Sequence, residues 1–116
     1  MQMINPHTED GIIRVAIKGR MDADGLAGFE TEFLATVAAP GLPAIVDFSQ
    51  IEFMASLGMR LIIQTAKALA AKNTRMVILR PRPLVAEVLH IAGLKGLTPM
   101  TQDEDEAVRL AKGQHP

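Results

Sequence analysis

The chain has 116 residues, contains no cysteine, tryptophan or tyrosine, and balances 12 basic side chains against 13 acidic ones. Its length supports one hydrophobic core, so we expect a single domain over residues 1–116, with residues 113–116 fraying at the end. The missing cysteines exclude disulfide scaffolds, thiolate metal sites and cysteine nucleophiles. The net charge of −1 lacks the basic excess of nucleic-acid-binding proteins, and no apolar run approaches the ~20 residues of a membrane span. We therefore expect a cytoplasmic domain that neither binds nucleic acid nor crosses a membrane.

A strand and then an amphipathic helix are predicted for the first third of the chain. Apolar and polar side chains alternate over residues 11–19, which indicates a half-buried strand, and residues 1–7 can pair with it as a hairpin. From Asp22 the apolar side chains recur every three or four residues, which predicts one helix to about Ala39. Asp22 or Asp24 can cap the start of this helix, and a Pro-Gly pair follows its end.

The middle of the chain predicts two buried strands around a second helix. Residues 44–48 are apolar on both faces apart from Asp47, as in a central strand that is covered on both sides. Residues 57–72 repeat with helical periodicity, and their polar stripe contains Arg60. Residues 76–79 form a second continuous apolar run, so strand, helix and strand follow one another.

The last third predicts a helix, an edge strand and a final helix. The Arg-Pro-Arg-Pro loop of residues 80–83 ends at a proline that can begin a helix, and Gly93 can end that helix. Residues 98–101 suit an edge strand, and residues 103–112 suit a helix whose acidic residues gather at its N-terminal end. Strands that alternate with helices favour parallel, right-handed connections. The fold class is thus α/β or α+β, with a small, mostly parallel mixed sheet flanked by about four helices.

Known catalytic motifs are missing from the sequence. The chain contains neither the phosphate-binding loop of nucleotide hydrolases nor a Gly-x-Gly-x-x-Gly dinucleotide motif. Glu87 and His90 have a spacing that can bind a metal on a helix, but a single such pair is more often a solvated surface pair. The acidic run of residues 103–106 fits a solvated helix start, and Arg80 and Arg82 fit ordinary loop residues. We expect no catalytic residue, no metal site and no cofactor.

The connection before the second long helix has an unusual composition. Its second half, residues 53–58, is mostly apolar, although polar residues are typical of a connection. Ser56 falls at the expected N-cap of the helix, where a hydroxyl accepts a hydrogen bond from a free amide. Gly58 lies in the first helical turn and permits the close approach of another backbone or of a partner. The local pattern alone makes Ser56 a capping serine.

Four short segments, in this order and spacing, carry a family resemblance. Residues 19–22 read Gly-Arg-Met-Asp, residues 45–54 contain Ile-Val-Asp-Phe-Ser followed by Ile-x-Phe-Met, Ser56-x-Gly58 opens the second long helix, and residues 89–94 read Leu-x-x-x-Gly-Leu. Through them nearly the whole chain resembles the STAS domain family, the anti-sigma factor antagonists. The resemblance implies a mixed sheet flanked by helices and a function in protein binding.

The resemblance also implies a partner and a modification. In such antagonists the partner is an anti-sigma factor that is also a serine kinase, and it phosphorylates a serine at the start of the second helix. The dephosphorylated antagonist binds this kinase and frees the sigma factor, whereas phosphorylation breaks the complex. Ser56 matches that serine, so the resemblance implies that Ser56 is the phosphoacceptor.

The implied partner-binding surface gathers around this serine. Because Asp22 and Ser56 both open helices that follow strands of one sheet, they should lie close together. Met54 belongs to the surface, so Met54→Glu should abolish partner binding and leave thermal stability close to that of the parent. The partner-binding residues are Asp22, Met54, Ala55, Ser56, Leu57, Gly58 and Arg60.

The phosphoacceptor motif departs from the family pattern, which usually reads Asp-Ser-Ser-Gly. Ala55 and Leu57 flank Ser56 in place of the aspartate and of the second hydroxyl residue. A second hypothesis is therefore a STAS subunit that docks on a transporter ATPase or on a larger signalling assembly without being phosphorylated. A third is a small enzyme or nucleotide-binding protein that uses Asp22, Asp47 and Ser56 at the strand ends. The sequence indicates no particular oligomeric state.

Overall fold

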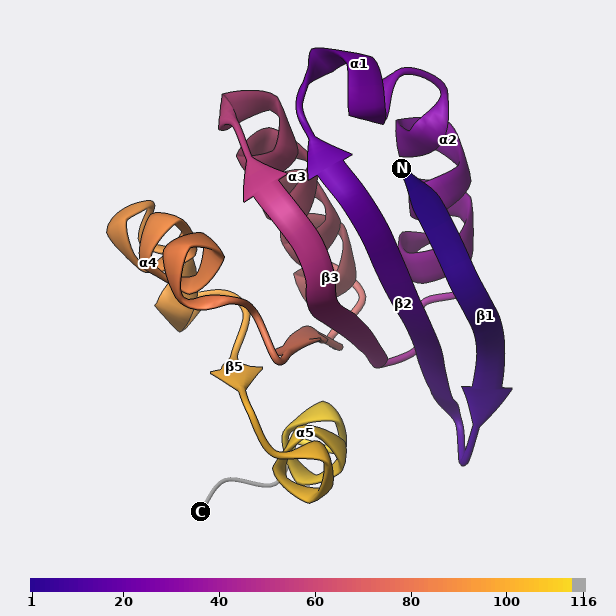
Figure 1. Cartoon of the computed structure of the whole chain (residues 1–116). Coiled ribbons are helices and arrows are strands. Elements are labelled where there is room, and N and C mark those ends of the chain that lie inside the picture. The colour runs from indigo at the N-terminus through magenta and orange to yellow at the C-terminus, as the bar shows by residue number, and fades with distance from the viewer. Residues whose placement is uncertain (114–116) are drawn as a thin grey trace.

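A five-stranded mixed sheet with strand order β1-β2-β3-β4-β5 forms the centre of the computed structural model, which describes residues 1–113 (Figure 1). The first pair of strands is antiparallel and the other pairs are parallel. This arrangement confirms the predicted α/β class with a mostly parallel mixed sheet. Of the predicted fraying tail, residues 114–116 lie outside the described residues. The strands are β1 (Gln2–Glu9), β2 (Ile12–Met21), β3 (Ala44–Met54), β4 (Met76–Leu79) and β5 (Met100–Thr101).

The predicted hairpin closes through a two-residue turn. Glu9 pairs with Ile12, and between them Asp10 and Gly11 adopt φ angles of 53° and 75°. Positive φ at both central residues is the geometry whose twist matches that of the flanking strands, and an Asp-Gly pair favours it. This tight turn therefore pairs β1 with β2 and leaves β1 at the edge of the sheet.

The predicted helix from Asp22 to Ala39 is broken, which corrects the sequence-based interpretation. Gly28 adopts a φ of 76° between α1 (Ala23–Leu26) and α2 (Phe29–Phe33), and this left-handed conformation interrupts the helical hydrogen bonds. A π-helical segment (Leu34–Ala38) continues α2, with the Ala39 amide donating to the Leu34 carbonyl at 3.0 Å. The break does not show in the apolar periodicity of the sequence. Both short helices still place apolar side chains in the core, including Phe29 and Phe33 of α2.

The remaining helices begin and end close to the predicted positions. Pro83 is the first residue of α4 (Pro83–Ile91), and Gly93, with a φ of 79°, follows its end and precedes a short 3₁₀ segment (Leu94–Gly96). The other two helices are α3 (Ser56–Ala70) and α5 (Glu104–Ala111). Among the described residues, no helix combines the length and the apolar character that crossing a membrane would require.

The two faces of the sheet bury different side chains, because neighbouring residues of a strand point to opposite faces. The larger core lies on the face covered by α1 to α4 and contains Val46, Phe48 and Ile78. Ile45 and Val77, one position away along the same strands, pack on the other face against Ala107 of α5. The helices that follow β2, β3 and β4 thus share one face, and α5 alone covers the other.

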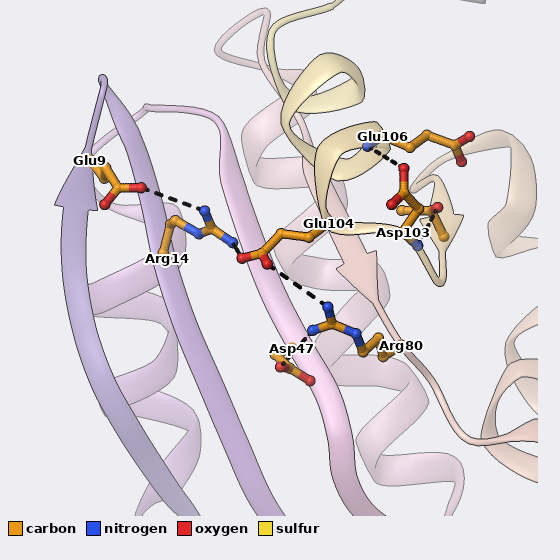
Figure 2. Close-up of polar contacts among 8 residues, drawn as sticks. Glu9, Arg14, Asp47, Arg80, Asp103, Glu104 and Glu106 are labelled. Atoms are coloured by element: carbon orange, nitrogen blue, oxygen red, sulfur yellow. Dashed lines mark hydrogen bonds and ion pairs between the residues drawn. The ribbon is translucent and has the colours of Figure 1, made fainter.

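A chain of ion pairs fastens α5 to the sheet (Figure 2). Glu104, the first residue of α5, lies 2.5 Å from a guanidinium nitrogen of Arg14 on β2 and 3.8 Å from one of Arg80. Arg14 also contacts Glu9 at 3.6 Å, and Arg80 contacts Asp47 at 3.7 Å. The fully buried side chains of α5 are the small Ala107 and Ala111, with Val108 and Leu110 partly buried beside them, so these charges add to the hydrophobic attachment.

Strand β3 is longer than predicted. The sequence-based strand ended at residue 48, but the backbone continues extended to Met54, so residues 49–54 belong to a strand and not to a connection. The cause is the length of β2, which offers partners along the whole segment: Gly19 pairs with Ile51 and Met21 with Met54. Two register shifts between β2 and β3 accommodate this pairing. The apolar composition of this segment is thus partly that of a buried strand.

Candidate functional site

Strands β2 and β3 end side by side at one end of the sheet (Figure 1). Asp22 and Ser56 follow these two strand ends in the chain. Met21 is paired with Met54, and the Ala55 amide donates to the Met21 carbonyl at 3.0 Å. Asp22 and Ser56 directly follow these paired segments and open α1 and α3. The strand register therefore places these two residues at neighbouring strand ends.

The carboxylate of Asp22 is fixed by two contacts. Its Oδ1 atom accepts a hydrogen bond from the Gly25 amide at 2.8 Å, which caps α1. Its Oδ2 atom accepts from the Arg20 Nε atom at 3.2 Å. The Gly25 amide, and after it the Arg20 side chain, lower the pKa of Asp22 below its ordinary value. Asp22 is therefore ionised at neutral pH, with its charge paired to that of Arg20.

Arg20 links this carboxylate to an exposed aromatic ring. Its guanidinium carbon lies 4.5 Å from the centre of the Phe53 ring, a distance typical of a cation–π contact. The Phe53 side chain is 41% exposed near the end of β3. Neither Arg20 nor Phe53 is among the partner-binding residues expected from the sequence. The only available signal was their place within the segments that carried the family resemblance.

Ser56 is the first residue of α3 and not its N-cap, which corrects the sequence-based assignment. Ala55 occupies the N-cap position in extended conformation, and this helix start has no side-chain capping hydrogen bond. The first backbone bond of the helix runs from the Met59 amide to the Ala55 carbonyl at 3.1 Å. The amides of Ser56, Leu57 and Gly58 therefore precede the intrahelical ladder. Ser56 is exposed at this start of the helix.

Exposure divides the predicted partner-binding residues into two groups. Ser56 and Arg60 are exposed, Leu57 is 38% exposed, and Ala55 is half-buried. Together with Asp22 these four residues form one patch, which we call the α3-start surface.

Met54 and Gly58 are buried, so the structure contradicts their assignment to an accessible surface. Met54 is 6% exposed and belongs to the core, because its strand position turns its side chain under α3. A Cβ atom at Gly58 would lie 2.7 Å from the Cβ atom of Met21. The close approach that the glycine permits is thus that of the protein's own strand β2, not that of a partner.

A hollow of about 200 Å³ lies beside Leu57. The broken helix forms its wall, including Leu26, Gly28 and Thr31. An uninterrupted helix, as the sequence predicted, would not supply the bend at Gly28. The hollow makes the α3-start surface concave beside Leu57, so that a partner side chain can fit there.

The three residues of the third hypothesis are not brought together, because Asp47 lies apart from Asp22 and Ser56. Asp47, which the third hypothesis grouped with Ser56, lies seven residues before the end of β3 and contacts Arg80 instead (Figure 2). At about 3.3 Å per residue, Asp47 lies roughly 23 Å along the strand from the end of β3. Glu87 and His90 are both exposed on α4. Within residues 1–113, no three His, Asp or Glu side chains are grouped so that they could hold a metal ion.

Comparison with known proteins identifies the family. The family model described as the STAS domain matches residues 3–107. This chain belongs to the STAS domain family. BtrV of Bordetella bronchiseptica, a candidate anti-sigma factor antagonist, is 23% identical over 103 residues that cover 89% of this chain and 89% of BtrV. The resemblance drawn from the four sequence segments is confirmed.

Solved structures share the fold of this STAS domain. An anti-sigma factor antagonist from Mycobacterium paratuberculosis has a TM-score of 0.81 at 22% identity, covering 96% of this chain and 93% of that one. The Bacillus cell fate determinant SpoIIAA in its phosphorylated form has a TM-score of 0.67 at 19% identity, covering 94% and 97%. At these identities the likeness shows the fold, and the chemistry of the site is argued from this chain's own residues.

Proposed function

We propose that this STAS domain is an anti-sigma factor antagonist whose α3-start surface binds an anti-sigma factor that is also a serine kinase. The observation that carries the proposal is the exposed Ser56 at the first turn of α3, next to the charged Asp22 and the exposed Leu57. The names of the relatives support it, since BtrV is a candidate antagonist of this class. In this proposal the chain acts in the cytoplasm by binding, without a catalytic reaction of its own.

Ser56 is the proposed phosphoacceptor. A phosphoserine carries about −1.5 to −2 charges, and the free amides and dipole at a helix N-terminus stabilise negative charge. Phosphorylation is therefore compatible with the folded domain. Phosphorylation would weaken binding at the interface itself. A partner that covers Leu57 and Ala55 would have to remove water from the phosphate. Removing water from an unpaired charge is strongly unfavourable, so the phosphate releases the partner with little change in the domain itself.

A second candidate function is a STAS subunit that docks permanently on a transporter ATPase or a larger signalling assembly. The observation in its favour is the composition around Ser56, where Ala55 and Leu57 replace the acid and the second hydroxyl of the family pattern. An adjacent acid could orient the hydroxyl or the metal–nucleotide for transfer, and Ala55 cannot. The α3-start surface would then bind through Leu57 without a switch.

Phosphorylation by the partner separates the two candidates. The parent and Ser56→Ala are incubated with the serine-kinase anti-sigma factor encoded in the same genome and with ATP, and the intact chains are weighed by mass spectrometry. The antagonist proposal expects one added phosphate on the parent and none on Ser56→Ala. A phosphate that persists on Ser56→Ala would refute the site. No phosphate on either chain would favour permanent docking.

A further inference from the structure

A groove of about 390 Å³ lies between the end of β3 and α4, away from the hollow beside Leu57. Figure 1 shows α4 beside β3. The β3 side of the groove contributes Glu52 and Phe53, and the α4 side contributes Leu84, Glu87, Val88 and Ile91. Its volume is that of a site for a few apolar side chains.

Helix α4 carries two neighbouring apolar stripes, roughly 100° apart around its axis, one buried and one exposed. Val85 and Leu89 point into the core. Leu84 and Ile91 are 77% and 76% exposed, although leucine and isoleucine usually become buried in a folded protein. Their spacing of seven residues, with Val88 between them, aligns them along one stripe of the helix. Such a stripe beside a groove is the geometry that receives the apolar face of another helix.

The charges of the groove select the occupant. Glu52 and Glu87 are the charged side chains that line it. A second copy of this chain fits poorly: Glu87 lies near the middle of residues 84–91, so a two-fold pairing of α4 with itself would set Glu87 against its own mate. Anionic lipid would meet the same repulsion. A helix whose apolar stripe is flanked by Lys or Arg would instead place its cations opposite both carboxylates.

The groove adjoins the α3-start surface. Phe53 lines the groove and also lies under Arg20, which is paired with Asp22. Two residues further along the chain, Ala55 begins the α3-start surface. One partner can therefore contact both regions without a gap between them.

We propose that this groove is a second docking site, which binds a basic amphipathic helix of a protein partner. Apolar side chains of the helix, spaced at three and four residues, fill the space between Phe53 and the Leu84–Ile91 stripe. Lys or Arg residues beside that stripe pair with Glu52 and Glu87. This inference goes beyond the proposed function, because it concerns other residues and does not depend on a kinase.

The test uses a synthetic helical peptide of about 18 residues, long enough to form a helix, with leucines at three- and four-residue spacing and flanking lysines. It is titrated into the ¹⁵N-labelled full chain, and amide chemical shifts are followed. The expected result is saturable binding with shift changes centred on residues 52–54 and 84–91. A matched peptide with glutamates in place of the lysines should bind several-fold more weakly.

Two variants connect the signal to the groove. The double variant Leu84→Ser/Ile91→Ser should weaken peptide binding by about tenfold or more, because it removes two apolar anchors. Both positions are highly exposed, so the thermal midpoint should stay near that of the parent. Glu87→Gln should weaken binding by about two- to fivefold and reduce its salt dependence. Glu32→Gln, at an exposed position on α2, serves as the charge-matched control and should leave peptide affinity unchanged.

Other outcomes would overturn the proposal. Shift changes outside the groove, absence of saturable binding, or equal affinity of the double variant would each contradict it. Dimerisation of the parent that the double variant abolishes, measured by sedimentation, would assign the face to a second copy instead. Binding to phosphatidylserine vesicles that the double variant abolishes would assign it to a membrane. Because the peptide assay contains no anti-sigma factor, its failure would leave the proposed function standing.

Discussion

Asp22 serves both the local fold and the charge of the proposed docking surface. Its carboxylate caps α1 through the Gly25 amide and pairs with Arg20, and both contacts favour its ionised form. An asparagine can replace an aspartate as an N-cap, but it carries no charge. The two roles can therefore be separated by substitution.

Asp22→Asn should weaken binding of the anti-sigma factor and should change stability in a pH-dependent way. Because folding lowers the pKa of Asp22, the unfolded chain binds the proton more readily, and the carboxylate's stabilisation is present above the ordinary aspartate pKa of about 3.9. It is lost as the pH falls through the folded-state value. The difference in thermal midpoint between parent and variant should thus be constant from pH 8 to about pH 5 and should shrink below about pH 4. A difference that already shrinks between pH 8 and pH 6 would point to another group.

Gly58 is a second residue whose role is internal. Alanine normally stabilises a helix interior relative to glycine by about 1 kcal/mol. Here the added Cβ atom would lie 2.7 Å from the Cβ atom of Met21, which cannot move without its strand. Gly58→Ala should therefore lower the free energy of unfolding by about 1–3 kcal/mol in a urea titration. Gly96→Ala is the matched control, since nothing lies within 4 Å of its added Cβ, and an equal loss in both variants would contradict the contact argument.

At the scale of elements, the periodic helices were predictable and the irregular ones were not. The apolar stripe of α3 and the proline that starts α4 fixed those helices within one or two residues. The break at Gly28 and the extension of β3 depend on neighbouring elements. Glycine tolerates several conformations, and a strand continues wherever an adjacent strand offers hydrogen bonds. Local sequence carries neither kind of information.

The same limit applies to the site. The resemblance located Ser56, and the structure shows it exposed to solvent as the first residue of α3. Burial of Met54 could not be predicted, because residues 49–54 read as a connection and an apolar side chain in a connection is usually exposed. The hollow beside Leu57 was equally hidden, since it is formed by the helix break.

Met54→Glu should therefore unfold or strongly destabilise the domain, in contrast to the neutral effect expected from the sequence. The glutamate would stand among core side chains without a partner, which costs several kcal/mol unless the group takes up a proton. Circular dichroism against temperature measures the loss. Met54→Leu, which nearly conserves the volume, should cost less than about 1.5 kcal/mol. If Met54→Glu melted with the parent, the side chain would have to be accessible after all.

The attachment of α5 is an element-scale feature that salt can test. Glu104 contacts both Arg14 and Arg80, while the side chains that α5 buries fully are the small Ala107 and Ala111. Glu104→Gln should lower the free energy of unfolding by about 0.5–1 kcal/mol at low ionic strength, and the loss should largely vanish at 1 M salt. Glu30→Gln, an exposed position outside this ion-pair chain, is the control and should show no such salt dependence. A loss independent of salt would mean that packing, not charge, holds α5.

At the scale of the whole molecule, the binding features gather toward one end of the sheet. The α3-start surface and the groove beside α4 adjoin each other through Phe53, and the ion-pair chain that fastens α5 lies on the opposite face. A partner can thus cover Ser56 without disturbing the attachment of α5. In this account the fold stays unchanged, and the charge at Ser56 sets the affinity of the domain for its partner.

The most direct test is the dissociation constant of the anti-sigma factor for the parent and for Ser56→Asp, measured by isothermal titration calorimetry. The account predicts that the added charge raises the dissociation constant by about 30-fold or more, because the interface must cover it. Gln2→Glu, which adds the same charge at an exposed position on β1, should leave the constant unchanged. Equal affinity of the parent and Ser56→Asp would contradict the claim that the partner binds over the start of α3.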